Sequence, residues 1–160
     1  MDSKYISVLI ICLLLSMVCM GTVCAKSMKT HDFGDFKMDV PTDSNFAEQA
    51  METDEDDDFG IKSELYLDNQ NQIMVMNTNS SIISQDNSYM MYTYMFDTVN
   101  MDLEKSYEYQ EENLRIIEPV SDSELYFSLV GISLGNNTIM LFGNDVNQLK
   151  SMAKTAELNS

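Results

Sequence analysis

Alternating apolar and polar residues predict a series of short β-strands along the chain. Residues 36–40 alternate with a period of two, the pattern of a half-buried strand, and Pro41 ends it. The same pattern predicts strands at 63–67 and 72–77, joined by a turn at 68–71 that is rich in Asn and Asp. Further strands are expected at 107–110, 114–118, 124–134 and 138–142.

Two segments show the spacing of an amphipathic helix. Near the C-terminus, apolar residues between 146 and 156 fall on one helical face, and Asn144 or Asp145 can cap its start. In 84–104, methionines and other apolar residues recur every four positions, which indicates a helix, whereas the tyrosines of this segment also suit a strand. We favour a helix there and keep the strand as the alternative.

These elements predict an α+β domain. We expect an antiparallel β-sheet with one central and one C-terminal helix packed on it, preceded by an N-terminal hydrophobic signal helix. Residues 1–25 form the signal peptide, 26–32 a polar leader, and 33–158 the single domain. Residues 42–60 are polar and are expected to form a loop with one helical turn near 46–51.

The N-terminus has the order of a secretory signal. Lys4 is followed by a nearly continuous apolar run, and the small residues around Cys24 predict cleavage between Ala25 and Lys26. The alternative is an uncleaved anchor, because residues 5–25 are uncharged and long enough to span a bilayer. In both cases the domain is extracytoplasmic, either secreted or held at the outer face of the membrane.

Amino-acid composition limits the kinds of metal site, catalysis and partner that are expected for the domain after the leader. All three cysteines lie in the leader, so the domain after it has no thiolate metal site, thiol nucleophile or disulfide. The formal charge is −17, and it remains −17 after cleavage because the leader contains one acid and one base. A charge of this sign repels the phosphates of nucleic acids, which excludes them as partners.

A dense acidic run is the first candidate for a cation site. Asp54, Asp56 and Asp58 have the spacing of the first three ligands of an EF-hand, but Phe59 occupies the place of the required glycine. We therefore favour a solvated acidic loop and keep a weak, irregular Ca²⁺ site on these three residues as the alternative. No other cofactor is expected.

Catalytic candidates are scarce. His31 is the only histidine and Arg115 the only arginine, so histidine-based metal sites and multi-arginine clamps are absent. We expect Arg115 to pair with a neighbouring acid and His31 to be an exposed surface residue. The many acids leave open a hydrolase that uses a pair of carboxylates.

Two further features concern modification and binding. Asn79 and Asn136 each begin an N-glycosylation sequence near a predicted turn, although such short sequences also arise by chance in an Asn-rich chain. Methionines and tyrosines cluster at 89–101, where they could form an adaptable binding surface. We favour a methionine-rich core as their explanation.

The two ends of the domain resemble a known group of proteins. The sequences HDFGDFKMDVP (31–41) and FGNDVNQLKSMAKTAEL (142–158) look like those of small exported proteins of uncharacterised function from methanogenic archaea. A more distant likeness is to PsbP-like α+β domains. The resemblance implies export and a cell-surface location, and it implies no activity.

From these features we expect a non-enzymatic, exported, acidic domain that acts by surface binding. Its candidate partners are a cation, cell-wall material or another exported protein. Contact with the membrane is expected only through residues 5–25, if they are not cleaved. The alternative is a carboxylate-pair hydrolase of the cell envelope.

Overall fold

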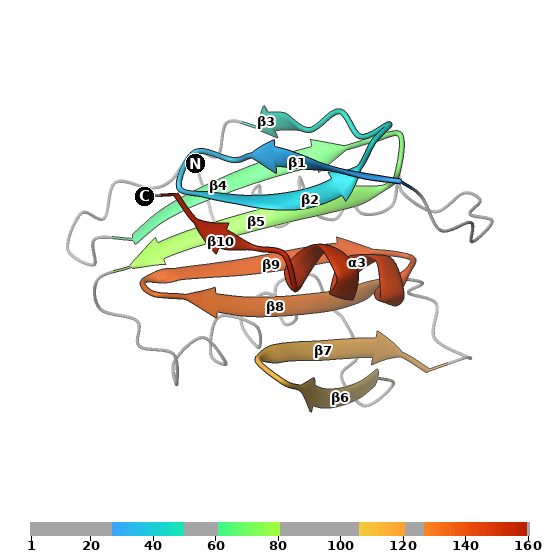
Figure 1. Ribbon diagram of the computed structural model, residues 1–160. Helices are drawn as coiled ribbons and strands as arrows, with labels where there is room; N and C mark the ends of the chain where they lie inside the picture. The colour runs from blue at the N-terminus through green and yellow to red at the C-terminus, as the bar shows by residue number, and fades with distance from the viewer. Residues whose placement is uncertain (1–26, 50–60, 81–105, 121–126, 160) are drawn as a thin grey trace, which may run out of the picture.

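The computed structural model describes residues 27–49, 61–80, 106–120 and 127–159. Within these ranges the chain forms ten strands and one helix, arranged as two antiparallel sheets (Figure 1). The elements are β1 (Met28–Asp32), β2 (Phe36–Pro41), β3 (Ala47–Gln49), β4 (Ile61–Asp68), β5 (Ile73–Ser80), β6 (Ser106–Glu111), β7 (Leu114–Pro119), β8 (Ser128–Leu134), β9 (Asn137–Gly143), α3 (Val146–Ala153) and β10 (Glu157–Leu158).

The larger sheet has seven strands in the order β3-β4-β5-β9-β8-β7-β6. Every neighbouring pair is antiparallel, and short turns join β4 to β5, β6 to β7 and β8 to β9. Two of these turns have two residues and place their first residue at positive φ, Glu112 at 56° and Gly135 at 58°. Such backbone angles suit tight hairpins because they match the twist of the flanking strands. Among the described strands, the β6–β7 hairpin ends the sheet on one side.

A second layer covers one face of this sheet. It consists of the three-stranded sheet β1-β2-β10 and helix α3, which lie together in front of the larger sheet in Figure 1. Phe36, Met38 and Val40 of β2 point into the core between the layers, as do Leu149 and Met152 of α3. The large sheet contributes Tyr66, Ile73, Val75, Leu114, Ile116, Val130, Ile132, Ile139 and Leu141.

The other face of the large sheet is also buried. Strand β9 is buried along its whole length, which explains its continuous apolar sequence. Three methionines contribute to this second face, and all are at most 5% exposed. Its buried apolar residues are Leu65, Leu67, Met74, Met76, Ile117, Leu129, Met140 and Phe142.

The expected α+β fold, with a central and a C-terminal helix on one sheet, is wrong. The described residues are mostly β, and the layer that packs on the large sheet is largely another sheet. The difference arises at β1, which lies within the expected polar leader and has mostly exposed side chains. Its pairing with β2 makes it a strand, and no apolar alternation reveals it. The expected helical turn near 46–51 is wrong too, because β3 occupies Ala47–Gln49.

The expected C-terminal helix is confirmed in a shorter form. Asp145 caps α3, since its carboxylate accepts hydrogen bonds from the N–H groups of Asn147 at 3.0 Å and Gln148 at 3.1 Å. The helix ends at Ala153, and β10 then pairs with β2. The expected signal helix at 1–25 and central helix at 84–104 lie outside the described residues. Along the described residues, no helix has the length and apolar character needed to cross a bilayer.

Candidate functional site

The most exposed aromatic side chains of the described residues lie on the edge strand β6. Tyr107 is 64% exposed and Tyr109 is 38% exposed. Both point to the face on which α3 lies, because Tyr109 is paired with Ile116, a residue of the core between the layers. We call these two residues the tyrosine edge. Exposed tyrosines are common in binding surfaces because they combine apolar area with a polar hydroxyl.

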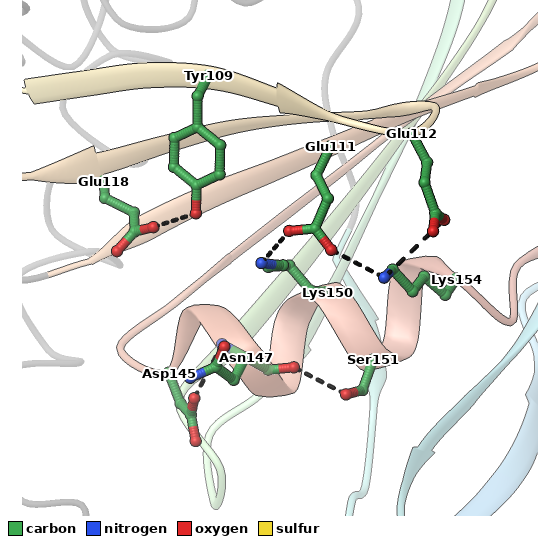
Figure 2. Close-up of polar contacts among 9 residues, drawn as sticks. All are labelled: Tyr109, Glu111, Glu112, Glu118, Asp145, Asn147, Lys150, Ser151 and Lys154. Atoms are coloured by element: carbon green, nitrogen blue, oxygen red, sulfur yellow. Dashed lines mark hydrogen bonds and ion pairs between the residues drawn. The ribbon is translucent and has the colours of Figure 1, made fainter.

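A charged cluster joins the end of this hairpin to helix α3 (Figure 2). It consists of Glu111, Glu112, Lys150 and Lys154. The Glu111 carboxylate forms ion pairs with Lys150 and, at 2.9 Å, with Lys154, while Glu112 lies 3.9 Å from Lys154. The hydrogen bonds from Lys150 and Lys154 lower the pKa of Glu111, and the hydrogen bond to Glu111 raises the pKa of Lys154. The cluster fixes the hairpin against the helix.

Tyr109 is held between this cluster and a second carboxylate. Its hydroxyl donates a hydrogen bond to Glu118, and the Lys150 Nζ lies 5.8 Å from the centre of its ring. The hydrogen bond to Glu118 raises the pKa of Tyr109 to about 12, so the phenol is neutral near pH 7. One ring therefore binds a carboxylate through its hydroxyl and an ammonium group through its face.

The opposite face of the hairpin carries an ion pair. Arg115 contacts Glu108 through its Nε and Nη2 atoms, each 2.6 Å from the same carboxylate oxygen. The prediction that Arg115 pairs with a neighbouring acid is confirmed. Because the two side chains come from paired strands, they also reinforce the register of the hairpin.

A separate polar cluster is formed by side chains of β4 and has a structural role. The Tyr66 hydroxyl donates to the Phe33 carbonyl at 2.7 Å and to Glu64 at 3.2 Å, and Glu64 pairs with Lys62. Burial and the neighbouring Glu64 raise the pKa of Tyr66. Burial acts to raise the pKa of Glu64. The hydrogen bond and the charge of Lys62, together with hydrogen bonds from Asn77 and Tyr66, outweigh burial, so the pKa of Glu64 is lowered. These contacts connect the large sheet to the loop before β2.

The candidate calcium ligands Asp54, Asp56 and Asp58 lie outside the described residues. Among the residues that are described, no three His, Cys, Asp or Glu side chains are grouped closely enough to hold a metal ion. The Ca²⁺ site on these three aspartates remains a hypothesis.

The structure gives the positions of His31 and of the two candidate glycosylation residues. His31 belongs to β1 and packs edge-on against the Phe33 ring, with 4.5 Å between the ring centres. Burial, followed by the charge of Lys29, lowers its pKa. Asn79 lies within β5 and is half-buried, whereas Asn136 is exposed in the two-residue turn between β8 and β9.

A carboxylate-pair hydrolase needs one carboxyl group with a raised pKa. Among the described residues, the carboxyl groups with clearly shifted pKa values are those of Asp32, Glu64 and Glu111, and all three are lowered. For Asp32 the main cause is a hydrogen bond from the Gly34 N–H, followed by one from Asn159. Lowered pKa values keep these carboxyl groups ionised near neutral pH, whereas a general acid must be protonated.

Sequence reasoning missed the tyrosine edge and the charged cluster. A signal was present, since Tyr107, Tyr109 and Glu111 are spaced by two and must share one face of a strand. Lys150 and Lys154 are spaced by four and share one face of a helix. Their meeting across the two elements depends on packing that no local pattern encodes.

Comparison of the chain with protein-family models gives no match, and comparison with curated proteins gives none either. The geometry of the tyrosine edge and the charged cluster is therefore the basis for a functional proposal.

Proposed function

We propose that this protein is a non-catalytic binding domain that works outside the cytoplasm and binds another exported protein or cell-wall material through its tyrosine edge. The observation that carries the proposal is Tyr107, a large aromatic side chain that is 64% exposed on the same face of β6 as Tyr109. Exposing a tyrosine to this extent leaves apolar area in water, and contact with a partner would remove it from water.

The surroundings of the tyrosine edge support binding. Tyr109 is held by Glu118 and Lys150, and the charged cluster holds the end of the hairpin to α3. A surface held in place before binding loses less conformational entropy when a partner arrives. The hairpin that carries the tyrosine edge is thus anchored to helix α3.

Sequence features support the extracytoplasmic location. An apolar leader ends near Ala25, and all cysteines lie within it. The resemblance of residues 31–41 and 142–158 to exported archaeal proteins agrees with this location. The charge of −17 favours basic partners over nucleic acids and other anions.

Isothermal titration calorimetry tests the proposal. A soluble lysine-rich peptide and a soluble cell-wall polysaccharide are titrated separately into the purified chain and into a Tyr107→Ala variant. We expect a saturable heat for at least one probe, with an affinity that falls severalfold in the variant. The variant should keep the wild-type melting temperature, because Tyr107 is exposed and contributes little to the core.

Three results contradict the proposal. A heat that continues after mixing, accompanied by breakdown of the probe, indicates catalysis. Saturable binding that is unchanged in Tyr107→Ala, or no binding of either probe, excludes the tyrosine edge as the binding surface.

A further inference from the structure

The outer edge of β6 has hydrogen-bonding groups in position to accept another strand. In a hairpin with a two-residue turn, the residues that flank the turn form a hydrogen-bonded pair, and the pairs then alternate along the ladder. Glu111 and Leu114 flank the turn here. The backbone groups of Glu108 and Gln110 consequently point away from β7, and no described strand pairs with that side of β6.

Side chains at the same edge favour a cation. Tyr107 is directly opposite Glu118 in the ladder, so the two side chains leave the hairpin on the same face. The Glu118 carboxylate on that face accepts the hydrogen bond from the Tyr109 hydroxyl. None of the described residues makes a hydrogen bond, an ion pair or a ring contact with the Tyr107 side chain. Its neighbour Tyr109 already has the ammonium group of Lys150 at its ring. The Tyr107 ring offers the same kind of contact to a lysine or arginine from outside.

We propose that β6 binds an extended, cationic segment of an exported protein as an additional antiparallel or parallel strand. Backbone hydrogen bonds to Glu108 and Gln110 hold the segment, and one of its Lys or Arg side chains lies over Tyr107 beside Glu118. Strand addition of this kind takes its affinity from the main chain and its specificity from alternate side chains. This inference rests on the proposed function and names its partner class.

Charge distinguishes this partner from a second copy of the same chain. Two bodies that each carry −17 repel one another, whereas a basic segment is attracted. The opposite edge of the large sheet is a poorer template, because β3 has only three residues and β6 has six. Strand β6 therefore combines two exposed tyrosines, an edge longer than that of β3, and a nearby carboxylate.

The test uses a fluorescent peptide of alternating Lys and Val residues, about ten long, with a Glu-Val peptide of the same length as its control. Fluorescence anisotropy with the full chain measures both affinities at low salt. We expect the Lys-Val peptide to bind and the Glu-Val peptide not to bind. Equal binding of the two peptides overturns the assignment of a cationic segment.

A matched pair of variants tests the added strand. Gln110→Pro removes an N–H group that points away from β7 and keeps the hydrogen bonds between β6 and β7 intact. Edge strands tolerate proline at such outward-facing positions. Gln110→Ala keeps that N–H. We expect the Kd of the Lys-Val peptide to rise about tenfold in Gln110→Pro and to stay within about twofold in Gln110→Ala. Equal affinities of the two variants overturn strand addition.

Hydrogen exchange gives a readout that needs no variant, in case Gln110→Pro does not fold. NMR of the wild-type chain should show slower amide exchange at Glu108 and Gln110 when the Lys-Val peptide is present. Unchanged exchange at both amides, with the peptide bound, overturns strand addition. If Tyr107→Ala still weakens peptide binding in that case, the proposed function stands and only the proposal of strand addition is wrong. If no probe binds at the tyrosine edge, both proposals are wrong.

Discussion

Neighbouring positions on one face of β6 have different roles. Tyr109 and Glu111 are both anchored to α3, the tyrosine through the Lys150 ammonium group and the glutamate through two ion pairs. Tyr107 lies two positions before Tyr109 on β6 and is the most exposed of the three side chains. Anchoring to the helix therefore separates the residues that hold the hairpin from the residue that is available for binding.

The lowered pKa of Glu111 predicts a pH-dependent contribution to stability. A folded-state pKa below the ordinary value of 4.5 contributes stability above that value, and the contribution is lost as pH falls through the folded-state pKa. We expect Glu111→Gln to be less stable than wild type near neutral pH, with the difference shrinking in acid. Urea denaturation at about pH 7 and about pH 3 measures it.

Glu112→Gln is the control for this prediction. Its side chain is 68% exposed and its contact with Lys154 is longer, at 3.9 Å, so the substitution should change stability less. A pH-independent difference between wild type and Glu111→Gln would contradict the role assigned to the ion pairs.

Helix α3 has only eight residues and depends on its surroundings. A helix of this length is not stable alone in water, because the cost of starting it exceeds the gain from so few hydrogen bonds. Asp145 satisfies two N–H groups at its start, and Leu149, Met152 and Ala153 are buried against the sheets. The cap and the apolar face together keep the helix where its lysines meet the hairpin.

Removing the cap should therefore destabilise the domain. We expect Asp145→Ala to lower the free energy of unfolding by about 1 kcal/mol, because the N–H groups of Asn147 and Gln148 lose their acceptor. Asp145→Asn keeps an acceptor oxygen and should retain most of the stability. Chemical denaturation compares the three proteins, and equal stability of wild type and the alanine variant would contradict the prediction.

At the scale of the whole molecule, the two layers are joined by apolar contacts. Phe36, Met38 and Val40 from the small sheet meet Leu149 and Met152 from the helix in one core against the large sheet. No cysteine follows residue 24, so disulfides do not contribute to joining them. Burial of apolar area is therefore the main source of stability, as expected for a domain without cross-links.

Truncation of a side chain in this core should be costly. Met152 is fully buried, and Met152→Ala should lower the free energy of unfolding by about 2–5 kcal/mol through lost contacts and the remaining cavity. Its exposed neighbour provides the control, since Ser151→Ala should change stability far less. A comparable effect of both substitutions in urea denaturation would argue against the layered core.

The net charge predicts a response to salt. Self-repulsion within a body of charge −17 opposes the compact state, and added ions screen it. We expect the melting temperature to rise as NaCl is added at neutral pH. Calorimetric scans check this, and a melting temperature that falls with NaCl would show that the ion pairs outweigh the repulsion.

Local patterns were sufficient to predict most strands. Alternation located β2, β4 and β5, and apolar runs located β8 and β9. They failed at β1 and β3, where most side chains are exposed and only backbone pairing makes a strand. The candidate site was missed for a related reason, because its parts lie on a hairpin and on a helix that are far apart along the chain.

The amino-acid sequence by itself determined the acidic charge, the N-terminal apolar run that contains every cysteine, and the period of most strands and of the C-terminal helix. These properties depend on composition or on residues close together in the chain, and each can be read locally. Tertiary structure alone decided that a second sheet covers the first, that Glu111 meets Lys150 and Lys154, and that Tyr107 lies on the last strand of the described sheet. Burial and strand pairing between distant segments control those outcomes, and neither is encoded in any one segment.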